Sequence, residues 1–174
     1  VLTWEAAALI GRNITEADSW SLSLLVIVPA CILLFINSCA NRAVRWPFNN
    51  HSATYLKGLT YIGGWLLLCT LYLDLSQSGY AAPLPYLPLL NPLDIAQGLA
   101  LIALTRWRIA ANKLSVQQPG SNETAQRIIS GWLFIWATTL LLRCVHHYAQ
   151  VAWEWDTLFG SNTVQAALSI FPLS

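Results

Sequence analysis

The chain has 174 residues, of which 56% are hydrophobic and only 10% are charged, whereas a soluble domain is usually about 25% charged. With Lys+Arg 9 against Asp+Glu 8, the chain has no net field that would attract nucleic acid or an acidic partner. This composition excludes disordered, collagen-like and disulfide-stapled proteins, and it indicates an all-α protein in a lipid bilayer.

Four hydrophobic segments predict a polytopic bundle of transmembrane helices, with spans at about 19–39, 55–75, 91–111 and 125–148. The first span has Pro29 as an expected kink site. The third begins at Asn91, Pro92 and Asp94, which suit the cap, the first position and the first turn of a helix. We therefore predict one transmembrane helical region, residues 1–174.

The end of the chain predicts the start of a fifth span at 163–174, which is about a dozen residues and too short for a bilayer that needs about 20. Met is absent and the first residue is Val1. Both features indicate an interior fragment of a longer protein. The bilayer and the remaining helices of that protein are then the expected partners.

Basic residues predict the orientation of the spans. Two of the connecting loops and their flanks hold 7 of the 9 basic side chains: Arg42, Arg45, Lys57, Arg106, Arg108, Lys113 and Arg127. By the positive-inside rule, loops 40–57 and 109–126 are cytoplasmic. Residues 1–18, 76–90 and 149–162 are then external.

The external loop 76–90 has no charge and three prolines, Pro83, Pro85 and Pro88. Proline at this density prevents a regular helix and removes backbone donors. The loop is predicted to lie along the membrane interface or to fold back into protein. Two interpretations remain open, a stiff hydrophobic connector and a cover over a pocket.

A polar cluster lies at the outer end of the fourth span, where Arg143 shares a helix face with His146 and His147. Arginine at the edge of hydrocarbon needs a partner or water, and Asp94 and Asp74 lie at the same predicted depth. The alternatives are a structural ion pair, snorkelling at the interface, and a substrate, lipid-headgroup or proton-relay site. Gln97, one turn past Asp94, and Gln165 are candidates to extend this cluster.

The residue patterns predict neither a metal nor a cofactor. The four cysteines form no CxxC pair and read as small buried residues. Neighbouring histidines on a helix diverge by about 100°, so His146 and His147 are poor joint ligands. The sequence contains no phosphate-binding loop, nucleophile elbow or dinucleotide fingerprint.

Three motifs carry a family resemblance: Leu84-Pro-Tyr-Leu-Pro-Leu-Leu-Asn-Pro-Leu-Asp94, Arg143-x-x-His-His147 and Val164-Gln-Ala-Ala-Leu-Ser-Ile170. In this order the chain resembles, over most of residues 40–174, the bacterial membrane-protein family called domain of unknown function 2339. The resemblance implies a multi-pass protein of the bacterial inner membrane and no assigned reaction. The family's signature positions map to Pro88, Asn91, Pro92, Asp94, Arg143, His146, His147 and Gln165. Phe171 and Pro172 depart from the family, which has a tryptophan soon after the last motif.

Three functions compete on this basis. The first is a transport or flipping module with a path lined by Asp94, Gln97, Arg143 and His147. The second is an envelope enzyme acting on a lipid-linked or periplasmic substrate, with His147 as general base, Arg143 holding a phosphate or carboxylate, and loop 76–90 as a lid. The third is a membrane scaffold without catalysis. The absence of a nucleophile or metal set places the enzyme below the transport module.

Overall fold

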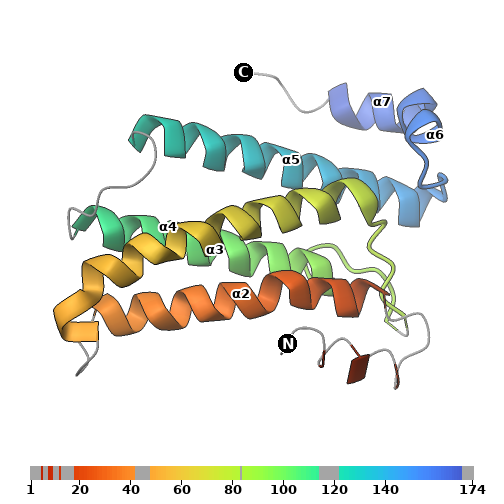
Figure 1. The fold of residues 1–174 in the computed structure, drawn as a ribbon. Helices are drawn as coiled ribbons and strands as arrows, with labels where there is room; N and C mark the ends of the chain where they lie inside the picture. The colour runs from red at the N-terminus through yellow and green to blue at the C-terminus, as the bar shows by residue number, and fades with distance from the viewer. Residues whose placement is uncertain are drawn as a thin grey trace.

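The computed structural model describes residues 5, 8, 9, 12, 18–41, 48–82, 84–113 and 122–169. Within these residues every regular element is a helix. The helices are α2 (Asp18–Asn41), α3 (Phe48–Ser76), α4 (Pro92–Lys113), α5 (Asn122–Ala149), α6 (Trp155–Gly160) and α7 (Asn162–Ser169). The four long helices lie side by side and alternate in direction, and α6 and α7 lie beside the end of α5 (Figure 1).

The predicted spans correspond to the long helices with small changes at their ends. Helix α2 continues through Pro29. Helix α3 begins at Phe48, earlier than predicted, because two helices join across a kink at His51 (φ −129°, ψ 23°). The predicted fifth segment begins as α7, whereas α6 was not predicted. Residues 170–174, with Phe171 and Pro172, lie outside the described residues.

Three of the described helices are long and hydrophobic enough to cross a membrane: Ser19–Cys39, His51–Ser76 and Glu123–Ala149. The fourth predicted span, α4, is not among them. It has 22 residues, but it carries Asp94, Gln97, Arg106 and Arg108, which lower its mean hydropathy.

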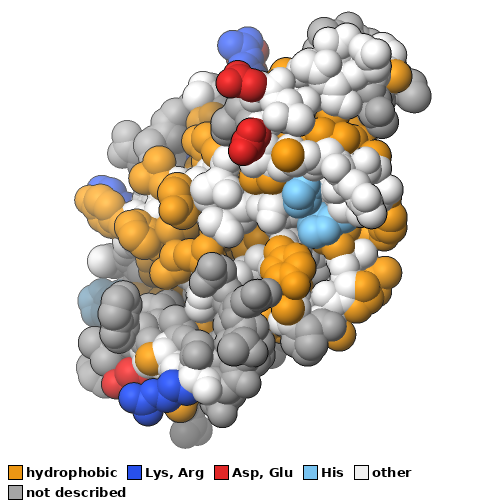
Figure 2. All heavy atoms as spheres, turned by 90° about the vertical axis from the view of Figure 1, so that its right-hand side faces the viewer, with side chains coloured by type: hydrophobic (Ala, Val, Ile, Leu, Met, Phe, Trp, Pro, Cys, Tyr) orange, Lys and Arg blue, Asp and Glu red, His pale blue; other side chains and the backbone are white. Residues whose placement is uncertain are grey.

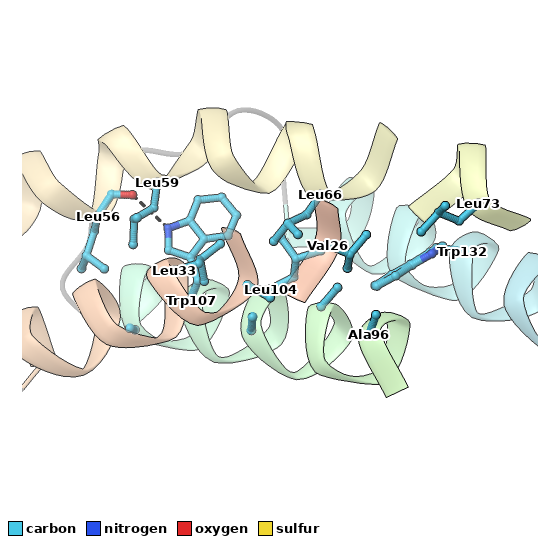
Figure 3. Close-up of a cluster of buried hydrophobic side chains, with 14 of the residues drawn as sticks. Val26, Leu33, Leu56, Leu59, Leu66, Leu73, Ala96, Leu104, Trp107 and Trp132 are labelled. Atoms are coloured by element: carbon cyan, nitrogen blue, oxygen red, sulfur yellow. Dashed lines mark hydrogen bonds between the residues drawn. The ribbon is translucent and has the colours of Figure 1, made fainter. Parts of the chain in front are cut away.

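Helix α4 packs in the middle of the bundle through a face of small residues. Ala96, Ala100 and Ala103 are all fully buried in the main hydrophobic core, which joins α2, α3 and α4. Small side chains let helix backbones approach closely, and this is the usual basis of helix packing in a membrane. Further along the same face, the Trp107 indole donates a hydrogen bond of 2.9 Å to the Leu56 carbonyl of α3 (Figure 3).

The outward faces of the long helices are hydrophobic. The side chains of Phe35, Tyr61 and Leu68 are 66%, 85% and 67% exposed. Exposed side chains of this size on consecutive helices suit contact with lipid rather than water. Cys31 also faces outward, so the expectation that all four cysteines are buried is wrong, and α2 presents this thiol on its outer face.

The small-residue face of α4 makes a testable prediction. Ala100→Leu adds three carbon atoms where no space exists, so we expect a loss of about 1–3 kcal/mol in unfolding free energy. Thermal unfolding of the purified intact protein in detergent measures this loss. Ile102→Leu, at a residue that is 54% exposed on the same helix, is the matched control and should leave the midpoint unchanged. Equal midpoints for the two variants would contradict the packing described here.

Candidate functional site

The side chain of Arg143, in α5, lies in the interior with none of its surface exposed. Its Nη1 donates to Asp94 Oδ1 at 2.7 Å, and its Nη2 lies 4.0 Å from Asp74 Oδ1. Its Nε donates to the Gln77 carbonyl and its Nη2 to the Leu73 carbonyl, each at 3.1 Å. One guanidinium therefore joins α5 to the end of α3 and the start of α4.

These partners lie at helix ends for a local reason. Carbonyls at the end of a helix can accept hydrogen bonds from a nearby arginine, and Arg143 binds two of them at the end of α3. The Leu73 carbonyl also accepts the Gln77 N–H at 3.1 Å. Helix α4 begins under an Asn91 cap, whose Oδ1 accepts the Leu93 N–H at 2.9 Å. This cap fixes the first turn of α4, from which Asp94 reaches the guanidinium.

Gln97 connects the second aspartate to the same group. Its Nε2 donates to Asp74 Oδ1 at 2.7 Å, and both residues are 1% exposed. Asp74 Oδ2 and Gln97 Oε1 are buried and accept no hydrogen bond from the described residues. We call Asp74, Asp94, Gln97 and Arg143 the Arg143 cluster.

The histidines, which the sequence grouped with Arg143, bind different segments. His147 Nε2 donates to the Ser78 carbonyl at 3.0 Å, and its ring stacks on Tyr86 with centroids 4.3 Å apart. His146 Nδ1 donates instead to the Val151 carbonyl at 2.6 Å. His147 thus borders the Arg143 cluster, whereas His146 stabilises the turn after α5. Figure 2 views this end of the bundle, where histidine side chains lie at the surface among hydrophobic ones.

Gln165 lies apart from the cluster. It is exposed in α7, and its Nε2 donates to the Phe159 carbonyl of α6 at 3.1 Å. Its contacts therefore join the two short helices to each other. Among the described residues, no group of three or more His, Cys, Asp or Glu has an arrangement that could hold a metal ion.

The proline-rich loop folds back across the end of the bundle. The Asn91 side chain donates to the Gly79 carbonyl, and the Trp20 indole of α2 donates to the Ala82 carbonyl at 3.2 Å. Pro88 lies half-buried in a turn at 88–90, and Pro92 is buried at the start of α4. The loop therefore contacts protein at Gly79, Ala82 and Tyr86, whereas its leucines Leu84, Leu87, Leu89 and Leu90 are exposed. Pro83 lies outside the described residues.

Tyr86 is the centre of this loop and was not predicted as a site residue. It is 7% exposed, and its carbonyl accepts a 3.1 Å hydrogen bond from the Tyr148 hydroxyl. Burial, and then the nearby Asp94 carboxylate, raise the pKa of the Tyr86 phenol, which stays protonated. The proline-rich motif contains Tyr86, but the sequence alone does not indicate that the Tyr86 ring stacks on His147.

Comparison with known proteins gives one match. A family model described as "Predicted membrane protein (DUF2339)" matches residues 1–173. This confirms the resemblance and extends it over the first 40 residues, which the motifs did not include. No curated protein and no solved structure matches the chain.

Gly79 holds the loop against the Arg143 cluster and gives a second prediction. Its φ is +84°, and an added Cβ would lie 3.1 Å from Tyr86 Cε2 and 3.2 Å from Arg143 Cδ. Gly79→Ala should therefore lower the unfolding free energy by about 1–2 kcal/mol or more. Thermal unfolding in detergent checks this. Gly131→Ala, in open space on α5, is the control and should leave stability unchanged or slightly raised; the same loss in both variants would contradict the strain at Gly79.

Proposed function

Since this chain belongs to the DUF2339 family of predicted membrane proteins, we propose that it forms four spans of a multi-pass protein of the bacterial inner membrane. In this topology loops 40–57 and 109–126 are cytoplasmic, and 1–18, 76–90 and 149–162 are external. The alternating directions of the long helices support the proposal, because they bring the described parts of 76–90 and 149–162 to one end of the bundle (Figure 1).

Helix α4 is the fourth proposed span, although it is the least hydrophobic. Its 22 residues extend about 33 Å, enough for a hydrocarbon core of about 30 Å. Its outward side carries Ile95, Ile102 and Ile109, spaced by seven residues and 50%, 54% and 62% exposed. Its polar residues Asp94 and Gln97 are buried in the bundle, where they need no contact with lipid.

The proposed function is a transport or flipping module, in which the Arg143 cluster is a proton-sensitive link between α5 and the α3–α4 pair. The observation that carries it is the complete burial of Arg143, Asp74 and Asp94 side chains at one end of the bundle. Ionisable groups inside a membrane protein are costly and are characteristic of ion pathways and proton relays.

The charges of the cluster do not balance when all groups are ionised. Two carboxylates face one guanidinium, and the helix ends add partial charges of opposite sign, negative from α3 and positive from α4. His147 and Tyr86 border the cluster and, when neutral, add no charge. An uncompensated buried charge costs several kcal/mol. One proton on Asp74 removes the excess charge. Three buried oxygens of the cluster, Asp74 Oδ2, Asp94 Oδ2 and Gln97 Oε1, lack a hydrogen bond from the described residues.

A proton on Asp74 predicts unequal effects of two similar substitutions. Asp74→Asn imitates the protonated acid, so stability at neutral pH should be unchanged or higher. Asp94→Asn breaks the 2.7 Å ion pair and should cost about 3–5 kcal/mol. Thermal unfolding of the purified intact protein compares the two. Equal losses would mean that both aspartates are ionised and that the proposed proton is absent.

The functional test uses the intact protein in its host. Asp94→Ala, Arg143→Ala, His147→Ala and Asp74→Asn are scored for rescue of a deletion strain under envelope stress, with membrane abundance measured in parallel. We expect Asp74→Asn to keep wild-type abundance and lose rescue, because its amide cannot exchange a proton. Asp156→Asn, at an exposed acid on the same end, is the control.

Two outcomes would overturn the transport proposal. In one, rescue falls only in proportion to abundance in every cluster variant, which would make the cluster a purely structural clamp. In the other, Asp74→Asn rescues fully, which would remove proton exchange from the mechanism.

A further inference from the structure

A second site lies at the opposite end of the bundle, where three helices leave a hydrophobic cavity of about 190 Å³. Its lining includes Gly63, Gly64 and Leu67 of α3, Leu104 and Arg108 of α4, and Ile129 of α5. We call this cavity the α3–α4–α5 groove. Except for Arg108 and Thr60, the side chains that line it are hydrophobic or absent.

Two glycines of α3 line the groove and have no side chains that could fill it. A Cβ on Gly63 would lie 3.1 Å from Leu104 Cδ2, so α4 packs closely there. A Cβ on Gly64 would meet nothing within 4 Å. Close packing between the helices therefore occurs at Gly63 and not at Gly64. Leu104 and Trp107, seen in Figure 3, form the α4 wall of the groove.

A second, more polar cavity of about 360 Å³ continues the groove. The two cavities share Arg108, Ala125 and Ile129. The second adds Asn112, Gln126 and Ser130 to the lining. The combined space is thus amphipathic, with hydrophobic walls along the helices, polar walls toward their ends, and Arg108 in the lining of both parts.

This arrangement matches the chemistry of one class of ligand. A phospholipid has an acyl chain that needs hydrophobic walls and a phosphate that suits a guanidinium and amide or hydroxyl donors. Lys113 and Arg106 are exposed at the same end and add positive charge, which favours an anionic headgroup over a neutral one. The hydrophobic walls lie between helices that face the bilayer, so lipid has direct access to them.

We infer that the α3–α4–α5 groove binds one anionic phospholipid, with an acyl chain over Gly64 and the phosphate at Arg108. The lipid fills the space between α5 and the α3–α4 pair at the end of the bundle opposite the Arg143 cluster. This binding needs neither the proposed proton nor transport, and it holds for either orientation of the bundle in the membrane.

Native mass spectrometry of the purified intact protein tests this site, with phosphatidylglycerol as the anionic probe and phosphatidylcholine as the neutral one. We expect the wild-type protein to retain phosphatidylglycerol about fivefold better, the effect of one cation near a headgroup with net negative charge, because the choline cation cancels the phosphate charge in phosphatidylcholine. Arg108→Gln should abolish this preference, whereas Arg106→Gln, at an exposed arginine outside the lining, should keep most of it.

A second pair of variants tests the hydrophobic part. Gly64→Leu fills the groove and should reduce retention of both lipids, whereas Gly58→Leu, in open space on the same helix, should not. Thermal unfolding establishes that each variant is folded. The inference is overturned if the wild type retains both lipids equally, if Gly64→Leu loses no more lipid than Gly58→Leu, or if neither lipid is retained because another helix occupies the groove.

Discussion

The buried guanidinium of Arg143 is the contact on which this end of the structure depends. It binds two carbonyls at the end of α3 and the carboxylate of Asp94 in the first turn of α4, so a single side chain joins two helix ends. The connecting loop must then return from α3 to α4 within reach of both. Gly79, the Asn91 cap and the covering ring of Tyr86 are consequences of that return.

The two ends of the bundle differ in how α5 is held. At the end with the Arg143 cluster, charged hydrogen bonds and the Tyr86–His147 stack close the space between α5 and its neighbours. At the other end, Gly64 offers no side chain and a cavity remains. Helices α2 and α4, by contrast, pack closely through alanines. The bundle therefore combines a tight α2–α3–α4 core with a helix α5 that joins this core through Trp132 and is held by charged hydrogen bonds at one end.

Much of this arrangement could be predicted from the sequence. The hydrophobic runs and the helix start at Asn91-Pro92 predict the four long helices. The shared predicted depth in the membrane is enough to pair Arg143 with Asp94 and Asp74. The carbonyls of Leu73 and Gln77 could not be predicted, because every residue has a carbonyl and only the packing selects two. The sequence places Gln165 in the cluster because of its predicted depth in the membrane. Its side chain instead binds a carbonyl of α6, a helix that was not predicted. The function of the cluster remains a prediction.

Helix α4 is the one long helix of the described residues that is not hydrophobic enough to count as a candidate span. A helix surrounded by lipid must be hydrophobic on every side, but a helix between others needs a hydrophobic surface only where it meets lipid. In α4 that surface is reduced to the line of Ile95, Ile102 and Ile109, while the opposite faces carry alanines for packing and Asp94 and Gln97 for the cluster. Its low hydropathy is therefore what a central helix should have. Of the residues that lower its hydropathy, Asp94 and Gln97 belong to the buried Arg143 cluster, whereas Arg106 is exposed and Arg108 lines the α3–α4–α5 groove.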